Sequence, residues 1–137
     1  MDPLSVTASI VALLQLTAVL TNFINDVRHA TSDQKKVALE ASNLHSLLLQ
    51  LRFRVDEAQS DDAWFDQVRL LGRDNGPLEQ FKHILEKMVE QTTMTGKRDR
   101  VKSALTWKWT KSEIAEALTQ MERLKTLITI ALTNDVL

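Results

Sequence analysis

The chain has 137 residues, 44% of them hydrophobic, which is enough for one domain with its own core. Its net charge of −1 gives no general attraction to nucleic acid or to acidic substrates. The absence of cysteine excludes disulfides, thiolate metal sites and a cysteine nucleophile, and it fits a reducing compartment. We therefore expect a single domain that covers residues 1–137.

Helix formers dominate the sequence, and only three Gly and two Pro interrupt it. No long stretch alternates apolar and polar residues in the way that a half-buried strand does. These features predict an all-α fold. A secretory signal is not expected, because residues 1–27 contain no Lys or Arg and Asp2 is acidic.

The first predicted helix covers residues 3 to about 30, with Asp2 as N-cap and Pro3 at the first helical position. From Pro3 to Asn25 it has no charged side chain, and apolar residues occur on every face. One interpretation is a central helix buried in the fold. The other is a helix that can span a bilayer, since the 23 uncharged residues reach roughly 34 Å and the hydrocarbon core is about 30 Å thick. The same helix could be buried in one state and inserted in another.

The second predicted helix covers residues 31–59 and begins with a capping box formed by Thr31 and Gln34. Its apolar residues follow an unbroken spacing of four and three, which places them on one face. A short helix over residues 60–72 follows, in which Trp64, Val68 and Leu71 are the expected core residues, and Gly72 ends it. The stripe of the second helix consists of Val37, Ala41, Leu44, Leu48, Leu51, Val55 and Ala58.

Two further helices are predicted, over residues 77–95 and 110–134. Pro77 is expected at the first position of one, and Thr110 and Glu113 form a capping box at the start of the other. Together the elements predict a compact bundle of four long helices with one or two short ones, in which neighbours are antiparallel. The expected core residues of the last two helices are Leu78, Phe81, Leu85, Met88, Ala117, Met121, Leu124, Ile128 and Ala131.

Basic residues and tryptophans gather between these two helices, with only Asp99 opposing them. Such a segment suits a membrane interface with anionic lipid, or nucleic acid, or it is a solvated connector whose tryptophans pack on the fold. The candidates for contact with lipid headgroups are Lys97, Arg98, Arg100, Lys102, Trp107, Lys108, Trp109 and Lys111.

No catalytic, cofactor or metal site is expected. His29, His45 and His83 are far apart in sequence and do not share a helical face at the spacing that a zinc site needs. No serine has a histidine and an acid in an arrangement that the sequence supports. We therefore expect a protein that is not an enzyme.

Several segments resemble one known family. The opening residues Met1–Ile10, continued by residues 14–17 (LQLT) and 23–27 (FINDV), resemble the N-terminal domain of fungal STAND receptors, which are NLR-like. The chain is similar to the HeLo-like domains, kin to the HeLo domain of heterokaryon-incompatibility proteins and, more loosely, to the four-helix executioner domain of the necroptosis pseudokinase. Other similar segments are Trp64-Phe65, residues 76–78, 107–113 and 122–125, and residues 131–135.

The resemblance implies a cell-death effector of innate immunity, cytoplasmic at rest and at the plasma membrane when activated. It implies activation by an upstream sensor or amyloid-signalling partner, followed by homo-oligomerisation, insertion of the N-terminal helix and membrane permeabilisation. The residues expected to insert are Leu4, Val6, Ile10, Val11, Leu13, Leu14, Leu16, Val19, Leu20, Phe23 and Ile24.

Two other functions remain open at this point. One is a helical adaptor that binds a partner protein and does not enter membranes. The other, less favoured, is a nucleic-acid binder that uses Lys97–Lys111.

Overall fold

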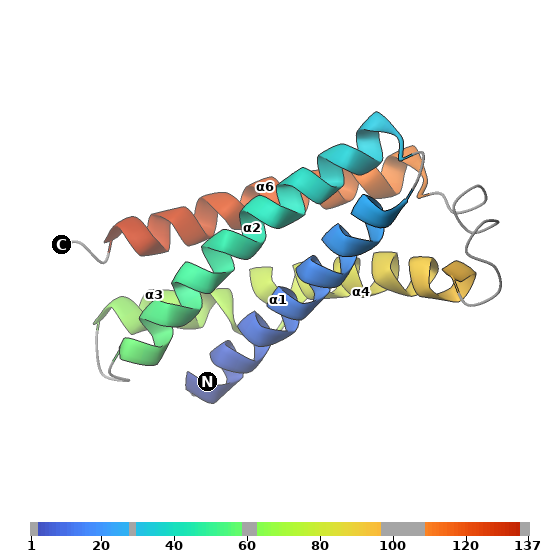
Figure 1. Ribbon diagram of the computed structural model, residues 1–137. Coiled ribbons are helices and arrows are strands. Elements are labelled where there is room, and N and C mark those ends of the chain that lie inside the picture. Colours follow the sequence, from blue (N-terminus) through green and yellow to red (C-terminus); the bar gives the residue numbers. More distant parts are fainter. Residues whose placement is uncertain (1–2, 28–29, 59–62, 97–108, 135–137) are drawn as a thin grey trace.

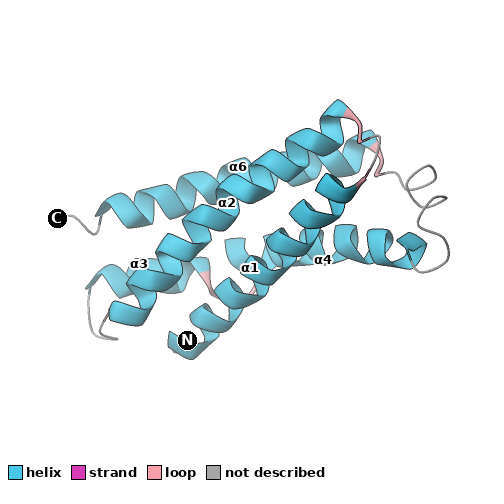
Figure 2. Ribbon diagram, in the orientation of Figure 1, coloured by secondary structure: helices cyan, strands magenta, loops and turns pink. Residues whose placement is uncertain are grey.

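The computed structural model describes the backbone of residues 3–27, 30–58, 63–96 and 109–134, and it describes side chains over residues 6–27, 30–58, 63–91 and 109–133. Within these ranges the regular structure is entirely helical (Figure 1, Figure 2), which confirms the all-α prediction. The helices are α1 (Pro3–Asp26), α2 (Ser32–Glu57), α3 (Ala63–Leu71), α4 (Pro77–Gly96) and α6 (Lys111–Asn134).

The long helices pack in pairs. α1 lies along α2 and α4, while α6 lies against α2 and α4 and also contacts the short helix α3. In Figure 1, α1 runs away from the N-terminal label and α2 returns beside it. α1 therefore has its main neighbours on two sides, and α3 touches it as well.

The helix starts are set by local hydrogen bonds, and two of them confirm predicted capping boxes. At α2, the Gln34 amide donates to Thr31 Oγ1 at 3.1 Å and the Thr31 amide donates to Gln34 Oε1 at 2.9 Å. At α6, Thr110 and Glu113 make the same pair of bonds, at 3.0 and 2.8 Å. Each box satisfies amides that a helix start otherwise leaves without a partner.

The apolar stripes predicted from spacing form the core. On α4 and α6 every predicted core residue is buried, and on α2 all of them are buried except Ala58, which is half-buried. A spacing of four and three residues keeps successive side chains on one face of a helix. The stripes of α2, α4 and α6 belong to one hydrophobic cluster together with the buried face of α1.

Two details of the predicted elements were wrong. α1 ends at Asp26, short of Ala30. In α3 the core residue is Phe65 rather than Trp64, because the helix begins at Ala63 and turns Phe65, Val68 and Leu71 inward. Trp64 is half-buried, and its indole N–H donates to the Ala131 carbonyl at 2.7 Å.

Gly72 follows α3 as predicted, but its role differs from that of a helix-ending glycine in a left-handed conformation, since it has no positive φ. A Cβ at this position would lie 2.9 Å from Val6 Cγ2, inside contact distance. Gly72 is buried there. The missing side chain lets the first turns of α1 approach the end of α3 closely.

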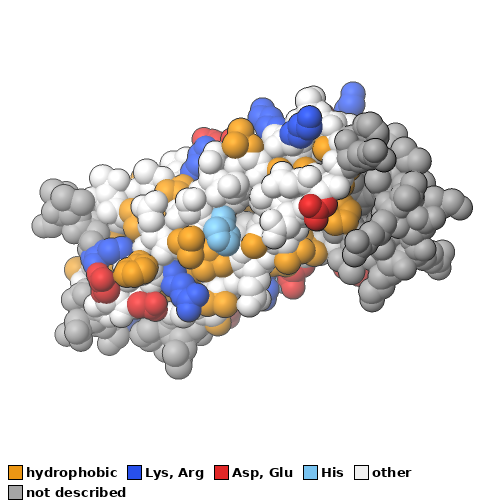
Figure 3. Space-filling view, in the orientation of Figure 1, with side chains coloured by type: hydrophobic (Ala, Val, Ile, Leu, Met, Phe, Trp, Pro, Cys, Tyr) orange, Lys and Arg blue, Asp and Glu red, His pale blue; other side chains and the backbone are white. Residues whose placement is uncertain are grey.

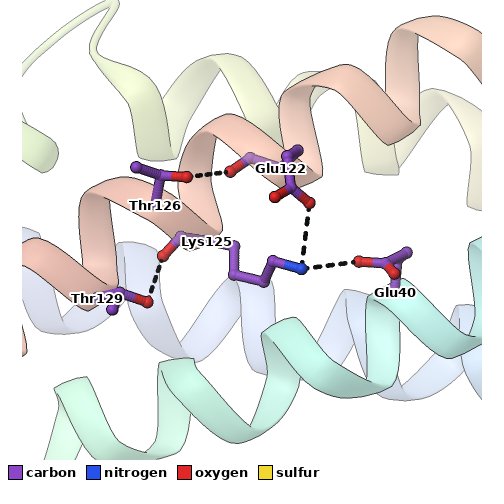
Figure 4. A network of polar contacts seen from close by, with 5 residues as sticks. All are labelled: Glu40, Glu122, Lys125, Thr126 and Thr129. Carbon is purple, nitrogen blue, oxygen red and sulfur yellow. Dashed lines mark hydrogen bonds and ion pairs between the residues drawn. The ribbon is translucent and has the colours of Figure 1, made fainter.

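A polar contact joins α2 to α6 near the surface (Figure 4). Lys125 Nζ lies 3.1 Å from Glu122 Oε2 and 3.3 Å from Glu40 Oε2. The hydrogen bonds to Glu122 and Glu40 raise the pKa of Lys125 above its ordinary value. Beside it, the Thr126 and Thr129 hydroxyls donate to carbonyl oxygens one turn earlier, at 3.0 and 2.7 Å.

Candidate membrane-active helix

α1 has a buried face and an outer face. Val6, Ile10, Leu13 and Leu20 on the buried face are fully enclosed by the other helices. On the opposite face Ala8, Gln15, Val19 and Asn22 are exposed. All the exposed residues between Val6 and Asn25 are uncharged, so the outer face of α1 differs from an ordinary solvated helix face.

The residues expected to insert are distributed over both faces. The largest group is buried, a second is half-buried, Val19 is 49% exposed, and the side chain of Leu4 lies outside the described residues. The structure therefore does not gather them on one surface in this state. The buried ones are Val6, Ile10, Leu13, Leu14, Leu20 and Ile24, and the half-buried ones are Val11, Leu16 and Phe23.

Among the described helices, α1 is the one long and apolar enough to cross a membrane. The segment concerned is Val6–Asp26, and 33% of it is buried in the fold. α1 thus packs on α2 and α4 and contributes to the core, as expected of a central helix, but it is not buried on all its faces. Among the described residues of α1, Val19 is the one large apolar side chain that is exposed.

Thr17 is the polar exception on the buried face of α1, with none of its surface exposed. Its Oγ1 lies 2.8 Å from the Leu13 carbonyl oxygen, 3.1 Å from that of Leu14 and 2.9 Å from His45 Nδ1 on α2. Sequence reasoning missed this contact between α1 and α2. The position of Thr17 within the stripe of Leu13, Leu20 and Ile24 was the signal that could have revealed it.

α2 extends the uncharged surface beside α1. Residues 41–51 contain no charged side chain. One row of side chains on α2 contains His45, which contacts Thr17 of α1. Leu49 and Phe53 follow in the same row, each one turn further along the helix. Leu49 is 48% exposed and Phe53 is 72% exposed. In Figure 3 the middle of this face is mainly orange and white, while blue and red side chains lie toward its ends and edges.

The predicted headgroup contacts fall mostly outside the described residues, namely Lys97, Arg98, Arg100, Lys102, Trp107 and Lys108. The two that are described differ from each other. Lys111 is exposed at the first position of α6. Trp109 is buried, and its indole N–H donates to the Met88 carbonyl at 3.3 Å, so in this structure Trp109 is a core residue.

Within the described residues, no group of three or more His, Asp or Glu side chains is placed to hold a metal ion. Glu113 lies in the groove between α4 and α6 with His83 and Lys87. The backbone amide of Thr110 and the side chain of Gln91 donate to its carboxylate and lower its pKa below the ordinary value of 4.5. These bonds make Glu113 part of a helix cap.

Comparison with known proteins gives no further guidance. No family model, no curated protein and no solved structure matches this chain.

Proposed function

We propose that this protein is a membrane-permeabilising cell-death effector domain that resembles the HeLo-like domains of fungal NLR-like receptors. It rests in the cytoplasm and acts at the plasma membrane, where it oligomerises and inserts α1. The observation that carries the proposal is α1, which is uncharged from Pro3 to Asn25, long enough to span a bilayer and only partly buried.

The energetics of transfer support α1 as the inserting element. Its buried apolar side chains are shielded from water in the fold and would be shielded again in hydrocarbon. The hydrophobic free energy of these side chains therefore changes little between the fold and the bilayer. A charge at the bilayer centre costs about 2.5–3.5 kcal/mol on insertion scales. The run from Pro3 to Asn25 has none.

The proposal requires that the other helices hold together when α1 leaves. The main neighbours of α1 are α2 and α4, while α2 and α4 each also pack on α6. We propose that the four long helices form a bundle with antiparallel neighbours along the chain, and that α2, α4 and α6 keep their mutual contacts when α1 leaves. α1 has the most extensive contacts of the described helices, so in this proposal lipid and neighbouring copies replace those contacts when it leaves.

Two partners complete the proposal. Anionic lipid would attract the basic segment from Lys97 to Lys111, where each Lys or Arg near the surface contributes about 1 kcal/mol. An upstream sensor or an amyloid-signalling partner would bring copies of the domain together. Oligomerisation follows from that local concentration.

The direct test is dye release from liposomes that contain anionic lipid, with the purified domain added at increasing concentration. Release that rises steeply with protein concentration is expected, because the active form is an oligomer. Intact liposomes at every concentration, with a well-folded protein, would contradict the proposal.

A second candidate function is a helical adaptor that binds a partner protein without entering membranes. Exposed Phe53 and Leu49 on α2 favour it, because large exposed apolar side chains are common at protein contacts. Intact liposomes, together with a purified partner whose binding is lost in Phe53→Ser, would support this function instead.

A further inference from the structure

The three atoms around Thr17 Oγ1 determine where its single proton lies. Two oxygens that approach to 2.8 Å without a proton between them would repel each other, so the hydroxyl donates to the Leu13 carbonyl. Thr17 Oγ1 then has only lone pairs left for His45 Nδ1, which is 2.9 Å away. With the hydroxyl proton donated to the Leu13 carbonyl, the bond between Thr17 and His45 requires the tautomer that carries its proton on Nδ1, in which this ring nitrogen donates.

We infer that Thr17 and His45 are the positioning pair that holds α1 in place on α2 and sets how readily α1 leaves. Thr17 and Gln34 are the buried polar residues of the described part, and Gln34 is occupied by the α2 cap. Apolar contacts between helices permit sliding and rotation, whereas a directional hydrogen bond specifies one register. The inference rests on the proposed function only for its link to membranes.

Loss of the hydrogen bond between Thr17 and His45 affects its two partners differently. When α1 moves away, the Thr17 hydroxyl keeps its bond to the Leu13 carbonyl, as threonines in membrane-spanning helices do. Thr17 therefore enters hydrocarbon without an unsatisfied donor. The group that loses its partner is His45 Nδ1–H, and His45 is only half-buried, so water can replace Thr17 there. The pair thus holds α1 in the fold without impeding insertion.

Hydrogen exchange tests the pair without any membrane. Thr17→Val keeps the side-chain shape and removes the acceptor, so amide exchange across residues 10–24 is expected to rise about 3- to 10-fold, the range that one net hydrogen bond allows. Thr17→Ser should restore slow exchange. His45→Leu should match Thr17→Val, whereas His45→Asn, whose side-chain amide can donate from nearly the same place, should lie close to the parent.

The matched control is Thr129→Val on α6. This change removes the same hydroxyl, but Thr129 Oγ1 bonds within its own helix and is exposed. Exchange in α1 should stay at the parent level in this variant. Two results for Thr17→Val would overturn the inference. One is amide exchange that accelerates equally in all the helices, and the other is amide exchange in α1 that stays at the parent level.

Dye release connects the pair to function. Thr17→Val and His45→Leu should release dye several-fold faster than the parent, and Thr129→Val should not. If the parent releases no dye, the proposed function fails, yet the exchange result still decides whether the pair positions α1. If the parent releases dye and the Thr17 and His45 variants match it, the pair does not control the departure of α1.

Discussion

Gln15 and Thr17 are two positions apart on α1 and have opposite environments. Both are polar residues in an apolar helix, so from the sequence either one is a plausible site for adding a charge without unfolding the protein. Gln15 is exposed, whereas Thr17 is fully buried and bonded to His45. Thr17→Arg would place an unpaired charge in the core and unfold the domain. Gln15 is therefore the informative site.

Gln15→Glu is expected to retain the fold and lose membrane activity. The new carboxylate faces water in the resting state but would enter hydrocarbon when α1 inserts. The melting temperature and helical circular dichroism should match those of the parent, and dye release should fall by at least tenfold. Gln50→Glu, at an exposed glutamine of α2, is the matched control and should release dye normally. Full release by Gln15→Glu would mean that α1 stays in the fold.

Glu113 gives a prediction about pH. Its pKa is lowered in the folded state by the Thr110 amide and by Gln91, so ionised Glu113 stabilises the fold above pH 4.5. This stabilisation is lost as the pH falls through the lowered pKa. Glu113→Gln, which keeps an acceptor but not the charge, should be less stable than the parent near neutral pH. The difference in urea midpoints should close at acid pH, and a difference independent of pH would contradict this account.

At the scale of elements, periodicity predicted α2, α4 and α6 well because each has a polar face and an apolar face. The capping boxes located the starts of α2 and α6, because each box is formed by residues that are close together in the sequence. The place of α1 could not be predicted this way, because apolar residues all around a helix do not say which side has neighbours. Phe65 was missed for a similar reason, since the short α3 leaves little periodicity to read. The contact between Thr17 and His45 depends on tertiary packing.

Gly72 is where α1 meets α3, and Gly72→Ala tests that contact. The added methyl group would meet Val6 Cγ2 at 2.9 Å, and the branched Val6 side chain has little freedom to turn away. Overpacking of this kind costs about 1–3 kcal/mol of stability. Urea unfolding should show this loss. In the double variant Val6→Ala with Gly72→Ala the loss should be smaller than the sum of the two single losses, and strict additivity would contradict the contact.

For the whole molecule, surface charge is distributed unevenly. The outer face of α1 carries only Asp26, at its last position, and residues 41–51 of α2 carry no charge, while the exposed side of α4 carries Glu86, Lys87 and Glu90. The basic segment from Lys97 lies outside the described residues, so its role remains a prediction from the sequence. The buried Trp109 shows why composition alone was not enough, because an indole beside basic residues suits a lipid interface and a core equally well.

Changing Lys97, Arg98, Arg100 and Lys102 together to Gln is expected to weaken binding to anionic liposomes. The loss should be at most about 1 kcal/mol for each residue, and it should shrink at high salt, where charges are screened. Co-sedimentation at two ionic strengths measures both effects. Unchanged binding at low salt would leave the segment as a connector between α4 and α6.

The central claim, that α1 enters the bilayer while the other helices do not, has a direct measurement. The chain has no cysteine, so Gln15→Cys and Gln50→Cys each accept one polarity-sensitive fluorophore at an exposed site. With liposomes that carry nitroxide on their lipid tails, the account predicts a blue shift and quenching of the label at residue 15 during dye release. The label at residue 50 should stay in water. Dye release with both labels in water, or with both equally quenched, would contradict the claim.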